Sequence, residues 1–283
     1  MGRTVVVTGA NSGIGLATAL ELAGAGYDVV GTVRSAAKAA SLADAAEDRG
    51  VDVRAVECDV ADAESTAKAF AEIEADAEIW GVVNNAGLAQ AGAIEDVGDE
   101  DVRYQLEVNL VAPARIARLV LPGMRDRGEG RIVNISSVAG RISLPLMGWY
   151  CASKHALEAM TDALRIEAAP YGVRVSLVEP VSFGTGIWDG ARYPDDAATS
   201  AYADAYERAR RATTAGSAVM PDPVWVARTV RLALGSPVPL ARYLIGADAV
   251  GGVLAERLVP TAVTDLVKGV ATGVRKLPFV GRP

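Results

Sequence analysis

Short runs of apolar residues alternate along this chain with longer segments in which apolar residues recur every three or four positions. The short runs are rich in valine and isoleucine and predict seven strands. They cover Arg3–Thr8, Asp28–Val33, Val51–Glu57, Ile79–Asn84, Arg131–Ser136, Val173–Val178 and Leu244–Gly246. Several of them are apolar at successive positions, so we expect strands that are buried on both faces.

The segments between these strands predict helices. The first helix follows the glycine-rich segment that ends at Gly15 and continues to about Gly24. The others cover Ser35–Arg49, Asp62–Asp76, about Asp99 to Met124, and Tyr150 to about Ala169. Strands that alternate with helices form βαβ units, and right-handed crossovers place the helices on both faces of one parallel sheet. The pattern predicts an α/β fold with a doubly wound, Rossmann-like parallel sheet in three α/β/α layers, and one domain over residues 1–283.

Two segments depart from this alternation. Residues 181–220 follow the carboxyl end of a predicted strand, where ligands bind in such folds. We expect an irregular insertion there that acts as a lid, because its aromatic residues argue against disorder. The extension over residues 250–283 carries basic residues among valines. A surface helix, an oligomer arm and contact with a membrane surface are alternatives for it.

Composition narrows the classes of function. The 283 residues carry a net charge of −7, which argues against a nucleic-acid partner. Cys58 and Cys151 give no disulfide framework and indicate a reducing compartment. His155 is the only histidine, so neither a Ser-His-Asp triad nor a histidine-based metal cluster is expected. No apolar run approaches the ~20 residues of a membrane span, and we expect a cytoplasmic protein without one.

A glycine-rich turn, Thr8-Gly9-Ala10-Asn11-Ser12-Gly13-Ile14-Gly15, follows the first predicted strand and opens the first helix. Gly9 permits a tight turn, Gly13 lets the backbone approach a pyrophosphate, and Gly15 lets the helix pack closely on the strand. The helix N-terminus then offers free N–H groups and a partial positive charge to phosphates. The sequence therefore predicts a dinucleotide site here.

The end of the second predicted strand indicates which dinucleotide. An NAD site usually has a carboxylate about 20 residues after the glycines. No acidic residue lies between Gly31 and Ala37, whereas Arg34 does. An arginine can pair with a 2′-phosphate, which favours NADP. A solvated arginine at a strand end is the alternative.

Two further strand ends carry candidate cofactor contacts. Asp59, after the third strand, could meet an adenine amino group or cap the next helix. Asn84-Asn85-Ala86-Gly87, after the fourth strand, has small residues that would let a cofactor lie against the backbone. A plain turn is the alternative for this second segment.

Asn109 stands on an otherwise apolar helix face, where a buried amide needs hydrogen-bond partners. Four residues later, Pro113 has no N–H to offer the Asn109 carbonyl. We expect a kink at Asn109, with an ordered water that relays protons towards Lys154. A kinked helix with one satisfied core amide is the alternative.

Tyr150 and Lys154 are one helical turn apart, with Ser136 and Ser137 shortly upstream. A tyrosine titrates near about 10, and a neighbouring ammonium lowers that value. We expect Tyr150 to exchange a proton with a substrate oxygen, with Lys154 depressing its pKa.

At these positions the chain resembles the single-domain short-chain dehydrogenase/reductases, particularly their hydroxysteroid and retinol dehydrogenase branch. The match runs from residue 3 to about residue 250 and rests on five motifs in family order: the Thr8–Gly15 turn, Asn84–Gly87, Asn109, Asn134–Ser137 and Tyr150-x-x-x-Lys154. The resemblance implies a catalytic tetrad of Asn109, Ser137, Tyr150 and Lys154. Pro180-Val181 departs from the family's usual Pro-Gly.

The residues expected to bind the cofactor are Gly9, Asn11, Ser12, Gly13, Ile14, Gly15, Arg34, Ser35, Asp59, Val60, Asn85, Ala86, Gly87, Tyr150, Lys154, Pro180, Val181 and Thr185. Those expected around the substrate are Ser137, Leu144, Met147, Trp149, Tyr150, Phe183 and Trp188. Because this second set is apolar and bulky, we expect a lipophilic substrate, such as a steroid, a retinoid or a long-chain carbonyl. Mutual packing of these side chains is the alternative.

The resemblance implies hydride transfer between NADP(H) and an alcohol or a carbonyl group. Alternatives are a reductase of small polar ketones or 3-oxoacyl thioesters, a non-catalytic NADP-binding regulator, and an enzyme that uses the same tetrad for epimerisation or dehydration. A stripe of small residues, Ala152, Ala156, Ala159 and Ala163, allows close helix packing. It fits either the homodimer or homotetramer interface common in the family or packing on the chain's own sheet.

Overall fold

The structure is a computed structural model that describes residues 2–181, 193–217 and 221–275. It contains the predicted parallel sheet, with strand order β3-β2-β1-β4-β5-β6-β7. The strands are β1 (Thr4–Thr8), β2 (Asp28–Val33), β3 (Val53–Glu57), β4 (Ile79–Asn84), β5 (Gly130–Ile135), β6 (Val173–Pro180) and β7 (Arg242–Ile245). Every neighbouring pair is parallel. The predicted seven-stranded α/β fold is confirmed.

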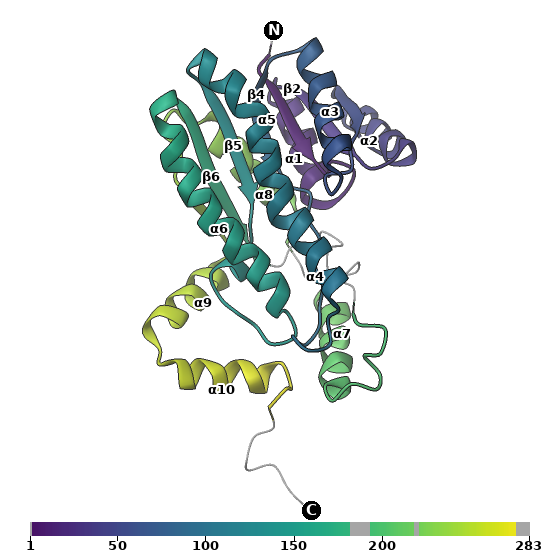
Figure 1. The fold of residues 1–283 in the computed structure, drawn as a ribbon, viewed down its shortest axis with the longest axis vertical. Coiled ribbons are helices and arrows are strands. Elements are labelled where there is room, and N and C mark those ends of the chain that lie inside the picture. Colours follow the sequence, from purple (N-terminus) through teal and green to yellow (C-terminus); the bar gives the residue numbers. More distant parts are fainter. Residues whose placement is uncertain (1, 182–192, 218–220, 276–283) are drawn as a thin grey trace, which may run out of the picture.

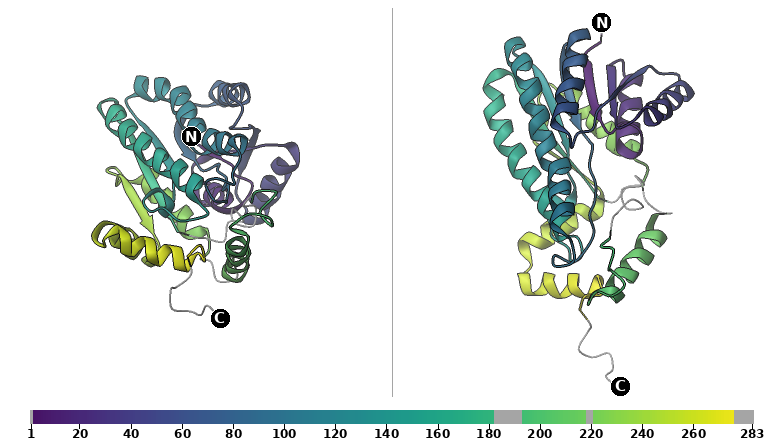
Figure 2. Two further views of the ribbon diagram at one scale, coloured as in Figure 1. Left: turned by 60° about the horizontal axis from the view of Figure 1, so that its bottom comes forward. Right: turned by 45° about the vertical axis from the view of Figure 1, so that its right-hand side comes forward.

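Helices cover both faces of the sheet, as Figures 1 and 2 show. One face carries α1 (Gly13–Gly24), α2 (Ala36–Arg49) and α8 (Val224–Gly235). The other carries α3 (Ala63–Asp76), α4 (Asp99–Leu106), α5 (Ala112–Arg127) and α6 (Gly148–Ala168). These are the three predicted layers.

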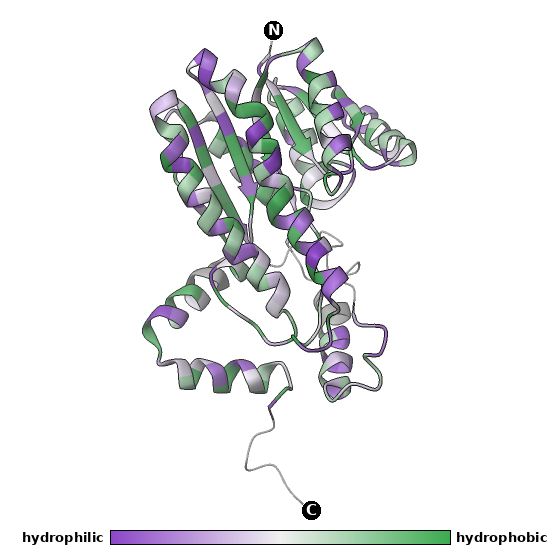
Figure 3. Cartoon of the chain, viewed as in Figure 1, coloured by the Kyte–Doolittle hydropathy of each residue, from purple (hydrophilic) through white to green (hydrophobic). Residues whose placement is uncertain are grey.

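The two largest parts of the core are slabs, one on each side of the sheet. In β1, Val5 and Val7 pack among the buried residues of α1, α2 and α8, whereas Val6 packs among those of α3 and α5. Successive strand side chains point to opposite faces, so a strand covered on both sides is apolar at every position. Figure 3 shows β1 in the colour of apolar residues over most of its length, whereas the helices are of mixed hydropathy.

Three further helices lie at the end of the molecule towards which the carboxyl ends of the strands point (Figure 1). These are α7 (Ala203–Ser217), α9 (Ala247–Leu258) and α10 (Thr261–Ala271). The insertion expected over residues 181–220 is therefore not irregular throughout. Buried Tyr206 anchors α7, because its hydroxyl donates to Asp96 Oδ2 at 2.5 Å and accepts from the N–H of Ala93 at 2.7 Å.

The strand order reverses direction between β1 and β4, which are neighbours although two strands separate them in sequence. Crossovers leave this point in opposite directions, so the loops at the carboxyl ends of β1 and β4 part and leave a crevice. Among the described residues, no helix is long and apolar enough to cross a membrane.

Candidate active site

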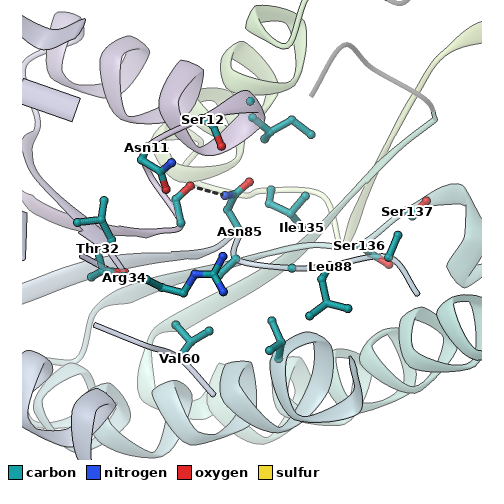
Figure 4. Close-up of a pocket in the computed structure, with 18 of the residues that line it drawn as sticks. Asn11, Ser12, Thr32, Arg34, Val60, Asn85, Leu88, Ile135, Ser136 and Ser137 are labelled. Atoms are coloured by element: carbon teal, nitrogen blue, oxygen red, sulfur yellow. Dashed lines mark hydrogen bonds between the residues drawn. The ribbon is translucent and has the colours of Figure 1, made fainter. Parts of the chain in front are cut away.

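One cleft of about 380 Å³ follows the carboxyl edge of the sheet at this switch point. It is lined by the glycine turn, the ends of β2, β3 and β5, the segment after β4, and residues of α4 and α6. Figure 4 shows Arg34 at one end of the cleft and Ser137 at the other. Most of the predicted cofactor residues therefore lie around a single cavity.

Each of the three glycines of the turn stands where another residue would be strained or would clash. Gly9 has a φ of +67° and Gly13 a φ of +54°, a region that other residues rarely adopt. A Cβ on Gly15 would lie 2.2 Å from the Gly9 carbonyl oxygen and 2.4 Å from Asn85 Nδ2. Gly15 does not line the cleft, and its contribution is the close packing of α1 on the turn.

The Thr8 hydroxyl fastens the end of β1 to the segment after β4. It accepts hydrogen bonds from the backbone N–H groups of Asn85 and Ala86, both at 3.0 Å. The Asn85 amide donates to the Thr8 carbonyl at 2.9 Å. The Asn85 amide thus faces the glycine turn, and the backbone of Asn85–Gly87 forms the cleft wall.

Two cations stand at the β2 end of the cleft. Arg34 lies there as predicted, and its guanidinium makes a long hydrogen bond of 3.5 Å to the Tyr104 hydroxyl. Lys38, in the first turn of α2, lines the same end. Sequence reasoning missed Lys38 and Tyr104. The signal for Lys38 was its position one turn after Arg34. Ser35 begins α2 as its N-cap and does not line the cleft.

Asp59 and Val60 line the cleft after β3. The Asp59 carboxylate accepts a hydrogen bond from the Ala61 N–H at 3.0 Å. Asp62, not Asp59, caps α3, because its side chain accepts from the N–H groups of Glu64 and Ser65. The alternative in which Asp59 serves as the helix cap is therefore wrong.

Asn109 lies in a π-helical turn, Glu107–Val111, between α4 and α5. In this turn the Ala112 N–H donates to the Glu107 carbonyl, five residues back. The buried Asn109 side chain accepts from the Leu88 N–H at 3.0 Å and donates to the Leu88 carbonyl at 2.9 Å and to Ser153 Oγ at 3.0 Å. It therefore ties the segment after β4 to α6. The ordered water inferred from Pro113 stays a prediction.

Tyr150 and Lys154 line the cleft from α6 and are buried. Lys154 Nζ donates to the Ile135 carbonyl at 2.9 Å and lies 5.9 Å from the Tyr150 ring centre. A hydrogen bond joins the Tyr150 side chain to Ser137. The Ser136 hydroxyl is buried and has no hydrogen-bond partner within the described segments. Of the two serines, Ser137 is thus the one that is bonded to Tyr150.

The sequence predicts a lowered pKa for Tyr150, and this prediction is wrong, because in the structure the pKa is raised. Burial raises the pKa of the phenol to about 12, although its hydrogen bond to Ser137 lowers it. Burial also lowers the pKa of Lys154 to about 8, against the attraction of Glu158. Loss of hydration disfavours the charged form of each group. Here that loss outweighs any benefit to the phenolate from an ammonium whose nearest acceptor is the Ile135 carbonyl.

The predicted substrate residues other than Ser137 and Tyr150 separate into three groups. Leu144 and Met147 pack with buried Tyr150. Trp149 does not line the cleft, and its indole N–H donates to the Ile94 carbonyl at 3.3 Å. Adjacent helical residues point about 100° apart, so Trp149 cannot share the direction of Tyr150. Phe183 and Trp188, with the cofactor candidate Thr185, lie outside the described residues.

Val181 lines the cleft where the family pattern has glycine, and its N–H donates to the Ile245 carbonyl at 3.2 Å. Pro180, just before it, has its carbonyl 3.4 Å from Ser137 Oγ. The departure from Pro-Gly thus adds an apolar side chain to the cleft.

Comparison with known proteins identifies the family. The sequence profile described as short chain dehydrogenase matches residues 3–195. The probable short-chain type dehydrogenase/reductase VdlC of Helicobacter pylori is 34% identical over 254 residues, which cover 85% of this chain and 87% of that protein.

Solved structures agree. A short-chain dehydrogenase from Streptomyces avermitilis superposes with a TM-score of 0.79 at 32% identity, covering 98% of both chains. A single-residue variant of the actinorhodin polyketide ketoreductase with NADPH superposes with a TM-score of 0.73 at 30% identity, covering 86% of this chain and 95% of that chain. The chain therefore belongs to the short-chain dehydrogenase/reductase family of oxidoreductases, which act on alcohol and ketone groups.

Proposed function

We propose that this protein transfers a hydride between NADP(H) and a lipophilic secondary alcohol, ketone or aldehyde. The observation that carries the proposal is one cleft with Arg34 at one end and Ser137 at the other (Figure 4). Lys38 accompanies Arg34, and Tyr150 and Lys154 accompany Ser137. The first pair fits a 2′-phosphate, and the second group fits a reacting oxygen.

The cleft residues fit a dinucleotide phosphate. The glycine turn brings backbone N–H groups to the N-terminus of α1, where phosphates bind. Arg34 and Lys38 supply positive charge for a 2′-phosphate, and no acidic residue stands between Gly31 and Ala37 to hold a free 2′-hydroxyl. The ketoreductase structure described above was determined with NADPH. These observations favour NADP(H) over NAD(H).

A bound nicotinamide would supply or accept the hydride. The protein's own groups then act on the substrate oxygen. Ser137 and Tyr150 donate hydrogen bonds to that oxygen as it gains negative charge, which stabilises the transition state. Tyr150 delivers the proton in reduction and removes it in oxidation. Its raised pKa keeps the phenol protonated at neutral pH, as a proton donor must be.

Lys154 and Asn109 hold this arrangement. Lys154 projects beside Gly87, where a Cβ would lie 3.9 Å from Nζ and 3.3 Å from Asn109 Oδ1. A cofactor ribose against the Gly87 backbone would therefore meet the ammonium. Asn109 fixes Ser153, whose hydroxyl donates to the Tyr150 carbonyl at 2.7 Å, and so positions the first turn of α6.

The proposed lipophilic substrate rests on the surroundings of Tyr150. Ala89, Ala139, Leu144 and Met147 pack around it and offer no charged group. The name of the actinorhodin ketoreductase indicates a polyketide ketone for that enzyme. Reduction of small polar ketones or 3-oxoacyl thioesters is the second candidate within the same chemistry.

A cytoplasmic homo-oligomer is part of the proposal. Ala152, Ala159 and Ala163 are exposed along α6. Of the two alternatives for this stripe, packing on the chain's own sheet is thus disfavoured and a subunit interface is supported. Light scattering at micromolar concentration tests it, and a monomer would contradict it.

The decisive experiment follows the absorbance of reduced nicotinamide. Purified protein is incubated with NADPH or NADH and with ketosteroids, retinal, long-chain ketones and small polar ketones. We expect oxidation of NADPH with the lipophilic carbonyls and little with NADH. Preference for short polar ketones would contradict the substrate class. Tight NADPH binding without turnover of any carbonyl would favour a non-catalytic regulator.

A further inference from the structure

Two glutamates with no part in the reaction described above are buried beside it. Glu158 on α6 is 5% exposed, and Glu179 at the end of β6 is 1% exposed. The two carboxyl groups are within hydrogen-bonding reach of each other. Two carboxylates cannot donate to each other, so this contact is favourable only when one of them carries a proton.

One oxygen of the pair lacks an ordinary donor. Oε2 of Glu158 pairs with Arg242 Nε at 3.0 Å. Oε1 of Glu158 is buried and has no hydrogen-bond partner within the described segments. An unsatisfied buried acceptor is unfavourable, because it has lost its hydrogen bonds to water and gained none in the protein. A protonated Glu179 is a donor that reaches this carboxylate.

The cations around the pair do not remove the need for a proton. Glu179 Oε1 lies 3.1 Å from Arg242 Nε and 3.3 Å from Arg141 Nη1. Arg242 also pairs with Glu158 and with Asp162, whose second cation is Arg165. One guanidinium is thus shared by three carboxylates. Burial and the Glu158 charge raise the pKa of Glu179 to about 7, against the two arginines that lower it.

The pair also touches each segment that carries a reacting group. Glu158 is one helical turn after Lys154, Arg141 is four residues after Ser137, and Glu179 directly precedes Pro180. The Glu158 charge raises the pKa of Lys154, against the burial that lowers it. Within the described segments, Glu158 is the charged group that acts on Lys154 from its own helix. Arg242 on β7 pairs with both Glu158 and Glu179, and Arg141, in the loop after β5, pairs with Glu179 on β6.

We propose that Glu158 and Glu179 hold one proton between them at neutral pH, and that the charge left on the pair keeps the buried Lys154 protonated. Both are positioning residues for the catalytic centre. The consequence for turnover rests on the proposed function, whereas the protonation states do not.

The first test measures the pair directly. Protein labelled with ¹³C at the glutamate carboxyl carbons is titrated by NMR from pH 5 to pH 9, and the pair is assigned with E179Q. We expect one carboxyl signal to titrate near neutral pH, well above the usual value of about 4.3. Both carboxyls ionised throughout this range would overturn the shared proton. Because the wild-type titration reads the folded native chain, it stays decisive if E158Q proves unstable.

The second test measures Lys154, with ¹³Cε-labelled lysine and assignment by Lys154→Arg. In E158Q the charge of the pair moves to Glu179, beside Arg141 and Arg242, and away from the residue whose charge acts on Lys154, so we expect the Lys154 midpoint to fall by about 1 unit. E179Q is the matched control, since it keeps the Glu158 charge and a donor, and it should leave the midpoint in place. An unchanged midpoint in E158Q, or equal shifts in both variants, would refute the proposal.

The third test is the pH profile of kcat/KM for ketone reduction with NADPH. E158Q should shift the fall of kcat/KM at basic pH to lower pH and leave kcat/KM unchanged below that fall. A merely structural defect would lower kcat/KM at every pH. If no carbonyl is reduced, the proposed function fails, and the two NMR titrations still decide the protonation states.

Discussion

Removing the positive charge at the β2 end of the cleft is the sharpest perturbation that the structure offers. Arg34 and Lys38 both line this end, whereas Ser137, the hydrogen-bond partner of Tyr150, lies at the other end of the cleft (Figure 4). In the proposed complex they meet a 2′-phosphate, which NADPH has and NADH lacks. Arg34→Ala, Lys38→Ala and the double variant should therefore weaken NADPH binding and leave NADH binding unchanged.

The expected magnitude follows from the exposure of the site. Hydrogen bonds to charged groups contribute about 1.5–3 kcal/mol, and Arg34 is exposed to solvent, which favours the lower value. A loss of about 1.4 kcal/mol is tenfold in the dissociation constant. Each single variant should thus raise the Kd for NADPH about tenfold, and the double variant up to about a hundredfold.

Fluorescence titration of NADPH and NADH measures both constants for each variant. Arg49→Ala is the control, because Arg49 is an exposed arginine at the far end of α2 and does not line the cleft. Added salt should reduce the wild-type preference, as it screens exposed charges. Equal losses for NADPH and NADH would refute the assignment of these side chains to the 2′-phosphate.

Three further outcomes are expected. Tyr150→Phe keeps the buried ring but removes the proton donor. Turnover in a nicotinamide absorbance assay should therefore fall at least about a hundredfold, while the Kd for NADPH stays unchanged. Substantial residual turnover would disprove the role of Tyr150 as the proton donor. Gly15→Ala should cost about 1–3 kcal/mol in urea unfolding and abolish nucleotide binding, because its Cβ would lie 2.2 Å from a backbone oxygen. Gly24→Ala, with its nearest contact at 3.9 Å, is the control, and equal effects would refute the packing argument. Burial lowers the pKa of Lys154 from 10.5 to about 8 in the folded state, so the unfolded chain binds more protons between these two pH values. The stability of the wild type relative to Lys154→Met should therefore rise with pH across that window. Urea unfolding of both proteins at pH 7, 9 and 10 measures the difference, and a difference that does not change with pH would contradict the burial argument.

Much of the fold could be predicted because it depends on local patterns. Strands covered on both faces must be apolar at successive positions, and Val5, Val6 and Val7 made β1 readable without any knowledge of its partners. The helix α7 could not be predicted in this way. Its position depends on two hydrogen bonds of Tyr206, which donates to Asp96 and accepts from the N–H of Ala93, more than 100 residues away in sequence.

The candidate site could likewise be predicted where it depends on local sequence patterns, and not where it depends on distant contacts. The glycine turn and the Tyr150–Lys154 pair have short, fixed spacings, and the structure brings them to one cleft. The direction of the Tyr150 pKa shift could not be predicted, because it depends on how completely the fold buries the phenol. Ser153 was missed for a similar reason, since its bond to Asn109 joins two helices.

The π-helical turn at Glu107–Val111 fixes the number of residues between α4 and α5. Such a turn holds one residue more than an ordinary α-helical turn. Deleting a single residue there would restore a regular α-helix. The flanking helices α4 and α5 would keep their packing, but the wide turn that presents Asn109 to Leu88 would be lost. Relatives should therefore accept substitutions at the other positions of this turn, and a one-residue gap there should mark a chain that has lost the reaction.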